Sequence, residues 1–253
     1  MKPLFSALGF LTVIPVPVRP METGDLGRAA PWFPAGALAV GLVACAAHMA
    51  CRLVFPPAVG AVVTVAAWAW ITGGLHLDGV ADCGDGFFAA VSRERRLEIM
   101  RDPRMGAFGG IALTLFLFLK VAAVMEIRGE IRGAAAVGPE LALFFAPVVA
   151  RYMLLFVARQ PAARPGGLGD EFSKSLKLGA FIAGGIVVVA VGLLDLYPLR
   201  AGMALGAAVL ATALVSVIAR AKLGGMTGDV LGLAVELSEA AVLLVYTTRL
   251  GGA

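Results

Sequence analysis

Seven long apolar runs dominate this sequence and limit the folds that it can adopt. They cover about residues 32–55, 58–75, 105–126, 138–158, 176–196, 199–219 and 230–249. A helix needs roughly 20 apolar residues to cross the hydrocarbon core of a bilayer, and most of these runs reach that length. We therefore expect an all-α polytopic membrane helix bundle, with about seven transmembrane helices in a single domain over residues 1–253. Because the 58–75 run is short, six or eight crossings are the alternatives.

Composition supports a membrane protein and excludes several other classes. The chain is 60% hydrophobic and 15% charged, whereas soluble proteins are about 45–50% apolar and about 25% charged. Disordered, collagen-like, coiled-coil and disulfide-rich secreted proteins do not have this composition. The three cysteines provide neither a disulfide framework nor a zinc site.

The N-terminal stretch Leu4–Val18 is apolar but too short to span a bilayer. Pro15 and Pro17 lie where a signal peptide would carry small residues before its cleavage site. We therefore expect a short helix that lies in the membrane interface or re-enters the bundle, with a cleaved signal peptide as the alternative.

The basic residues predict an orientation. If the N-terminus is cytoplasmic and seven spans alternate, fourteen of the 21 lysines and arginines fall inside and five outside, while Lys120 and Arg151 lie within runs. This asymmetry follows the positive-inside rule. It predicts a multi-pass protein of the cell (inner) membrane, in contact with membrane lipid, with its acidic motifs on the cytoplasmic side. The net charge of only +4 gives no reason to expect a nucleic-acid partner.

Three aspartates, Asp78, Asp82 and Asp85, follow the second run. Spacings of four and seven residues place all three on one face of a helix. Three like charges on one face repel one another, and an all-oxygen ligand set favours Mg²⁺ or Mn²⁺ over zinc. A solvated, aspartate-rich helix end is the alternative, and the glycines within the segment could break the helix. His76 is either a base beside Asp78 or an interfacial hydrogen-bonding residue.

An arginine-rich segment follows at residues 93–106 and contains two acids, Glu98 and Asp102, four residues apart. The proline after Asp102 predicts a turn. Arg96, Arg101 and Arg104 could clamp phosphate oxygens, because the guanidinium group matches their geometry. The alternative is that these arginines only orient the protein in the membrane.

A glycine-rich turn precedes the last run and holds Gly224, Gly225, Thr227 and Asp229. Glycines let a backbone approach a ligand closely, so the turn is a candidate substrate-binding element. Capping of the following helix by Thr227 or Asp229 is the alternative.

Two acids, Glu236 and Glu239, lie deeper within the last run. Acids within a membrane face a cavity or a basic partner. Lys120 and Arg151 are the candidate partners.

Five blocks of sequence together resemble one family. They are FLTVIPVP at 10–17, GGLHLDGVADCGDG at 73–86, LEIMRDPRMGAFGG at 97–110, GLGDEF at 167–172 and GGMTGDVLGLAVELSE at 224–239. In this order they resemble the cobalamin (5′-phosphate) synthase family, also called adenosylcobinamide-GDP ribazoletransferase. The resemblance extends from near residue 4 to near residue 245.

The resemblance implies a Mg²⁺-dependent integral membrane enzyme. Such an enzyme joins adenosylcobinamide-GDP to α-ribazole or its 5′-phosphate and releases GMP, which completes the nucleotide loop of the corrinoid. On that basis we expect Asp78, Asp82 and Asp85 to hold Mg²⁺. Asp102 or Glu98 would complete the metal shell or accept the hydroxyl proton, with His76 as a further candidate base.

Other functions stay open at this stage. The pattern from Asp82 to Ala89 also resembles CDP-alcohol phosphotransferases, but Ala90 stands where that family has arginine. An ion-coupled transporter would explain Glu236 and Glu239, although no inverted repeat is visible. A homo-oligomer and a complex with other corrinoid-pathway enzymes are both compatible with the sequence.

Overall fold

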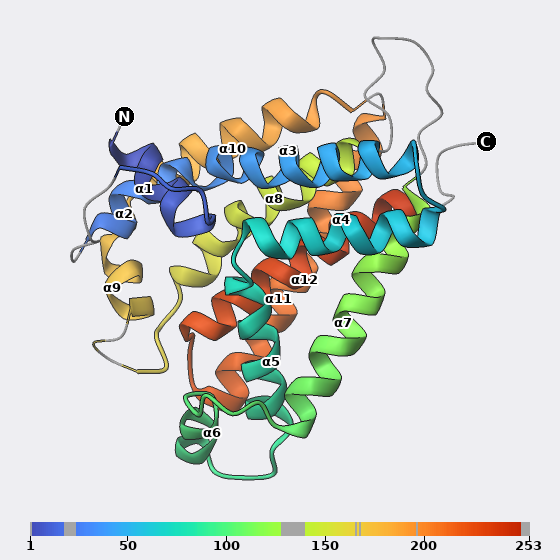
Figure 1. Cartoon of the computed structure of the whole chain (residues 1–253). Coiled ribbons are helices and arrows are strands. Elements are labelled where there is room, and N and C mark those ends of the chain that lie inside the picture. The colour runs from blue at the N-terminus through green and yellow to red at the C-terminus, as the bar shows by residue number, and fades with distance from the viewer. Residues whose placement is uncertain are drawn as a thin grey trace.

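The computed structural model describes residues 2–17, 24–127, 140–164, 166, 168–195 and 197–248. Within these residues the secondary structure is helical, with one isolated bridge between Ala162 and Met226. The helices, shown in Figure 1, are α1 (Lys2–Leu11), α2 (Asp25–Ala29), η1 (Ala30–Trp32), α3 (Phe33–Arg52), α4 (Pro57–Ile71), α5 (Leu75–Phe88), α6 (Arg93–Ile99), α7 (Ala107–Glu126), α8 (Leu141–Ala158), α9 (Leu168–Ser175), α10 (Leu178–Gly192), α11 (Pro198–Leu223) and α12 (Gly228–Thr247).

The expected membrane bundle is confirmed by the length and apolarity of these helices. In the described residues, five segments can cross a bilayer: Asp25–Arg52, α7, α8, α11 and α12. Two bent pairs, α4 with α5 and α9 with α10, raise the count to seven if each pair forms one span. The expected runs 138–158, 176–196 and 230–249 each extend into residues outside the described part of the chain.

The second span differs from the prediction. We expected one run over 58–75 followed by a polar connection, but the chain turns by 95° between α4 and α5 and continues as a helix to Phe88. Gly73 and Gly74 have φ values of 62° and 70°, which place both in the left-handed region that favours glycine. The aspartates therefore lie on a half-helix that packs within the bundle.

Helix α8 forms the centre of the bundle. It packs against α3, α10, α11 and α12, and 83% of its 18 residues are buried. Several of the surrounding helices have large exposed apolar side chains, such as Leu115 on α7 and Leu210 on α11. This pattern suits a bundle with a protein core and a lipid-facing exterior.

The N-terminal helix α1 is present, as expected, and packs on α3. Its Ala7 and Leu11 are fully buried, and Phe10 stacks on Phe33 with ring centroids 5.6 Å apart. Just after α1, the backbone N–H of Val13 donates to the carbonyl of Ile71 at the break between α4 and α5. This helix is therefore part of the bundle core and lies beside the half-helix that carries the aspartates.

Candidate active site

Close contact between α5 and α12 positions the aspartates. A Cβ atom on Gly79 would lie 2.5 Å from the carbonyl oxygen of Asp229 and 3.1 Å from the Cα of Gly232. Only glycine allows the two backbones to approach so closely. As a result the carboxylates of Asp78 and Asp229 both lie close enough to Asp82 to repel its charge.

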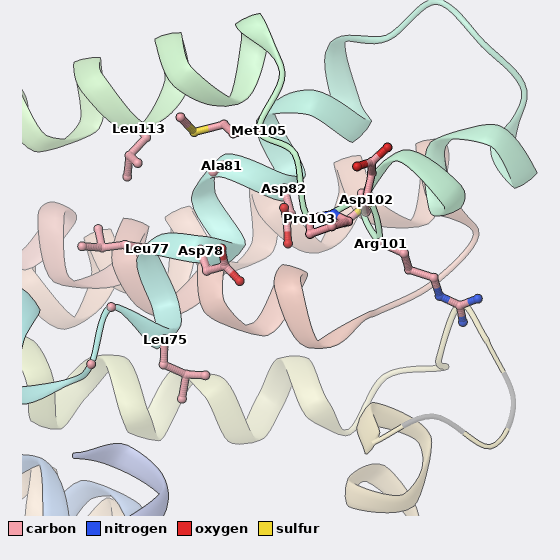
Figure 2. A pocket seen from close by; sticks show the side chains of 13 residues that line it. Leu75, Leu77, Asp78, Ala81, Asp82, Arg101, Asp102, Pro103, Met105 and Leu113 are labelled. Atoms are coloured by element: carbon pink, nitrogen blue, oxygen red, sulfur yellow. The ribbon is translucent and has the colours of Figure 1, made fainter. Parts of the chain in front are cut away.

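An acidic cleft opens beside α5 and has a volume of about 590 Å³. Its wall residues are Gly73, Gly74, Leu75, Leu77, Asp78, Ala81, Asp82, Met100, Arg101, Asp102, Pro103, Met105 and Leu113. Figure 2 shows Asp78 and Asp82 on α5, with the loop that carries Arg101, Asp102 and Pro103 across from them. The structure thus brings together four of the residues that the sequence suggested: Asp78, Asp82, Arg101 and Asp102.

Asp85 has a different environment from the other two aspartates. Its Oδ2 accepts a hydrogen bond of 2.6 Å from the backbone N–H of Gly106, and its Oδ1 accepts one of 2.8 Å from Gly109. These N–H groups belong to the start of α7, where free donors and the helix dipole favour an anion. Asp85 is therefore engaged as a cap for α7, and we do not expect it to be a primary metal ligand.

Arg96 does not lie in the cleft. Its guanidinium donates hydrogen bonds to the carbonyl oxygens of Gly86 and Phe87, and Lys222 donates to the same Phe87 oxygen at 2.7 Å. These carbonyls are the unpaired acceptors at the C-terminus of α5. Arg96 thus stabilises the end of the aspartate helix, and its predicted contact with substrate has no support in this position.

The turn at Asp102 is present as expected, and an ion pair shapes it. Arg104 donates to Asp102 through Nε at 2.9 Å, through a terminal nitrogen at 2.7 Å and through its backbone N–H at 3.0 Å. These hydrogen bonds lower the pKa of Asp102 to about 2. Glu98, by contrast, is exposed, pairs with Arg95 and is not among the residues that line the cleft.

Two arginines lie near Asp229 at the start of α12. Arg101 and Arg164 both interact electrostatically with Asp229. Burial and the nearby Arg101 lower the pKa of Arg164. Among the described residues Arg101 forms no ion pair within hydrogen-bonding distance, so its guanidinium can still bind a phosphate group. The sequence pattern did not single out Arg164, because it lies in an irregular polar stretch with no recognisable spacing.

The glycine-rich turn has structural roles, in helix capping and in close backbone packing. Gly224 has a φ of 75° and ends α11, while a Cβ on Gly225 would lie 2.6 Å from backbone atoms of residues 161 and 163. The hydroxyl of Thr227 accepts a hydrogen bond from the backbone N–H of Val230 and caps α12. The capping alternative is therefore confirmed for Thr227, and the next two residues, Gly228 and Asp229, line a pocket.

His76 belongs to a buried charge network beneath the cleft. Lys120 donates to Glu236 at 2.8 Å and to Glu239 at 2.5 Å. Arg151 pairs with the other oxygen of Glu239 and donates to Nδ1 of His76 at 3.3 Å. All five side chains are buried, and the two acids balance the two cations. The pairing confirms Lys120 and Arg151 as the partners of the deep acids, and it gives His76 a hydrogen-bonding role.

The oxygen ligands around the cleft are suited to Mg²⁺. Asp78, Asp82 and Asp102 line the cleft, and hard divalent cations prefer such carboxylates. Among the described residues, no group of three or more acidic, histidine or cysteine side chains is arranged so that it could bind a metal ion by itself. Mg²⁺ commonly uses one or two carboxylates together with substrate phosphates, so this arrangement fits a metal that binds with its substrate.

Comparison with known proteins covers nearly the whole chain. A family model described as Cobalamin-5-phosphate synthase matches residues 3–247. The chain is 40% identical to the adenosylcobinamide-GDP ribazoletransferase of Brucella anthropi, over 94% of this chain and 93% of that protein. It is 37% identical to the protein of that name in Brevibacillus brevis and 39% identical to the one in Klebsiella pneumoniae, with at least 96% of each chain covered. No solved structure matches the chain significantly.

Proposed function

The chain belongs to the cobalamin-5-phosphate synthase family, and we propose that it catalyses the reaction for which its relatives are named. It transfers the adenosylcobinamide-phosphate group from adenosylcobinamide-GDP to α-ribazole or α-ribazole 5′-phosphate. The observation that carries this proposal is the acidic cleft, which is lined by Asp78, Asp82, Arg101 and Asp102, in a chain that the family model matches over residues 3–247. Carboxylates beside a free arginine suit a phosphate ester rather than a bare ion.

In the proposed reaction, a ribose hydroxyl of α-ribazole attacks the phosphorus that is linked to cobinamide. A new P–O bond forms to the ribose oxygen, and the P–O bond to the GMP phosphate breaks. GMP leaves with the bridging oxygen, and the hydroxyl proton passes to a carboxylate at the cleft. Asp102 is a poor acceptor because its pKa of about 2 makes it a weak base. Arg101 and Arg164 stabilise charge on the phosphates.

Mg²⁺ dependence is part of the proposal. Asp78 and Asp82 would hold the ion, because their carboxylates line the cleft and lack the helix-capping role of Asp85. When bound, the ion supplies positive charge that neutralises the pyrophosphate and the leaving GMP. Asp78 and Asp82 in turn fix where the pyrophosphate can bind.

We also propose that the cleft faces the cytoplasm in a cell inner membrane. In the seven-span arrangement, α6 and the loop after α8 lie at one end of the spans, where most arginines and lysines gather. This distribution follows the positive-inside rule. Single cysteines introduced at Ser92 and at Leu53 should react with impermeant reagents from opposite sides of the membrane. Labelling of both residues from one side would contradict this topology.

The alternative of an ion-coupled transporter loses its main support in this structure. Glu236 and Glu239 are buried against Lys120 and Arg151, so the deep acids already have partners. Their charge balance explains why a membrane helix tolerates them.

The proposed function is tested with purified protein in lipid nanodiscs. Adenosylcobinamide-GDP, α-ribazole and Mg²⁺ should give GMP and the joined corrinoid in equal amounts. Leaving out α-ribazole, or removing Mg²⁺ with a chelator, should stop GMP release. If the intact protein released no GMP with all components present, the proposed reaction would be wrong.

A further inference from the structure

A second pocket lies beside α5 and shares residues with the acidic cleft. Its volume is about 240 Å³, and Leu75 and Asp78 line both cavities. The other wall residues come from α5 itself and from α1, α2, α8, α9 and α12. We call it the apolar pocket, because most of its walls are apolar.

The apolar walls come from five helices that meet around α5. Phe10, Leu26, Leu154, Phe172 and Leu231 line the pocket. Leu26, Leu154 and Phe172 are buried, so the walls are fixed by packing within the bundle. Such walls suit a flat aromatic group, which gains from burial of both its faces.

The polar groups of the pocket gather at α5 and α12. His76, Asp78 and Asp229 line it together, and the remaining lining residues are apolar or glycine. Carboxylates recognise ribose by accepting hydrogen bonds from its hydroxyls. An apolar chamber with carboxylates on one side therefore matches a nucleoside, with its base among the apolar side chains and its ribose near the aspartates.

We propose that the apolar pocket is the acceptor subsite, which binds the aromatic base of α-ribazole and directs its ribose toward Asp78. This inference rests on the proposed function. A corrinoid carrying a nucleoside diphosphate is far too large for about 240 Å³, so the nucleotide end of the donor enters the larger acidic cleft and the corrinoid ring stays outside both cavities. Because Asp78 borders both cavities, the two substrates meet at that residue.

This placement brings the attacking hydroxyl to the boundary between the cavities. The ribose oxygen would reach the cobinamide-linked phosphorus from the apolar pocket, while the GMP half of the donor lies in the acidic cleft. Asp229 lines the acceptor side only and accepts a hydrogen bond from the ribose.

Two glycines allow the pocket to be filled with little disturbance of the fold. Gly228, at the start of α12, lines the pocket, and a Cβ there would meet no atom within 4 Å. Gly169 also lines it, and its nearest contact would be at 3.9 Å. Gly179, near the start of α10, has equally open surroundings but does not line the pocket. Gly179→Val is therefore a matched control for Gly228→Val and Gly169→Val.

The experiment measures steady-state GMP release while each substrate is varied separately. Gly228→Val and Gly169→Val should raise KM for α-ribazole by about tenfold or more, equivalent to 1.4 kcal/mol of binding. KM for adenosylcobinamide-GDP should stay within about twofold, since the acidic cleft is unchanged. Gly179→Val should resemble the wild type for both substrates.

The outcomes separate this inference from the proposed function. A wild-type protein that releases no GMP would overturn the proposed reaction itself. An active wild type whose pocket variants keep a normal KM for α-ribazole would overturn only the acceptor subsite. The same holds if those variants raise KM for the donor instead. If Gly228→Val does not fold, Gly169→Val gives the same test from a different helix, α9.

Discussion

At the scale of single residues, three aspartates one or two turns apart on α5 have three different environments. Asp85 caps α7 through two backbone N–H groups, Asp82 faces the acidic cleft, and Asp78 borders both cavities. Helical spacing could predict their common face, because it depends only on the local backbone. It could not predict the cap, because the partner N–H groups lie more than twenty residues further along the chain.

Asp82 offers the most direct test of the metal assignment. We expect Asp82→Asn to lower kcat by about 10²–10³-fold, the typical effect of losing one group that stabilises transition-state charge. The shape of the side chain is kept, so the protein should still insert and fold. Glu98→Gln is the matched control, because Glu98 is exposed and pairs with the equally exposed Arg95 on its own helix. Full Mg²⁺-dependent activity in Asp82→Asn would show that this residue does not hold the ion.

The ion pair between Arg104 and Asp102 gives a prediction about pH. Arg104 keeps the pKa of Asp102 at about 2, so the carboxylate is ionised throughout pH 5–8. In Arg104→Gln the pKa should rise toward the usual value of about 3.9, which still lies below that range. In the wild type, the stability that the Asp102–Arg104 ion pair contributes is therefore fully present above about pH 4, and it is lost only as the pH falls through about 2. We expect wild type and variant to have the same shape of kcat/KM profile from pH 5 to 8. A new acidic limb within that range would contradict the assignment.

At the scale of elements, the sequence predicted the spans better than the break within one of them. Hydrophobic length is a local property, so the apolar runs match the observed helices. The 95° turn between α4 and α5 depends on two left-handed glycines and on packing of α5 against α12. The roles of Arg96 and Arg164 also depend on contacts between segments that are far apart in the sequence. Residue spacing does not predict such contacts.

The contact between α5 and α12 should be sensitive to a single methyl group. In Gly79→Ala the added Cβ would lie 2.5 Å from a carbonyl oxygen of α12, so the two helices must separate. We expect at least about a tenfold loss of kcat/KM, because small displacements of positioning groups have large effects on rate. Gly206→Ala is the control, since a Cβ there meets no atom within 4 Å. Equal activity in both variants would show that the close approach is not needed.

At the scale of the whole molecule, the buried charge network connects the half-helix of the site to the rest of the bundle. It joins α5 through His76, α7 through Lys120, α8 through Arg151 and α12 through its two glutamates. Its formal charge is zero with all four charged groups present, and the loss of any single one leaves a net charge in the bundle. The network therefore couples the stability of the bundle to the position of the aspartates.

Removal of one cation should show this coupling. Lys120→Met leaves two buried glutamates with one arginine, and breaking a buried pair in this way costs about 3–5 kcal/mol. The double variant Lys120→Met/Glu236→Gln restores charge balance, so it should recover much of that free energy of unfolding. Lys174→Met is the control, because its pair with Asp170 is exposed and such pairs contribute about 0–1 kcal/mol. Denaturant unfolding in mixed micelles measures all three. If the double variant were less stable than Lys120→Met alone, the stability of the bundle would not depend on charge balance in this network.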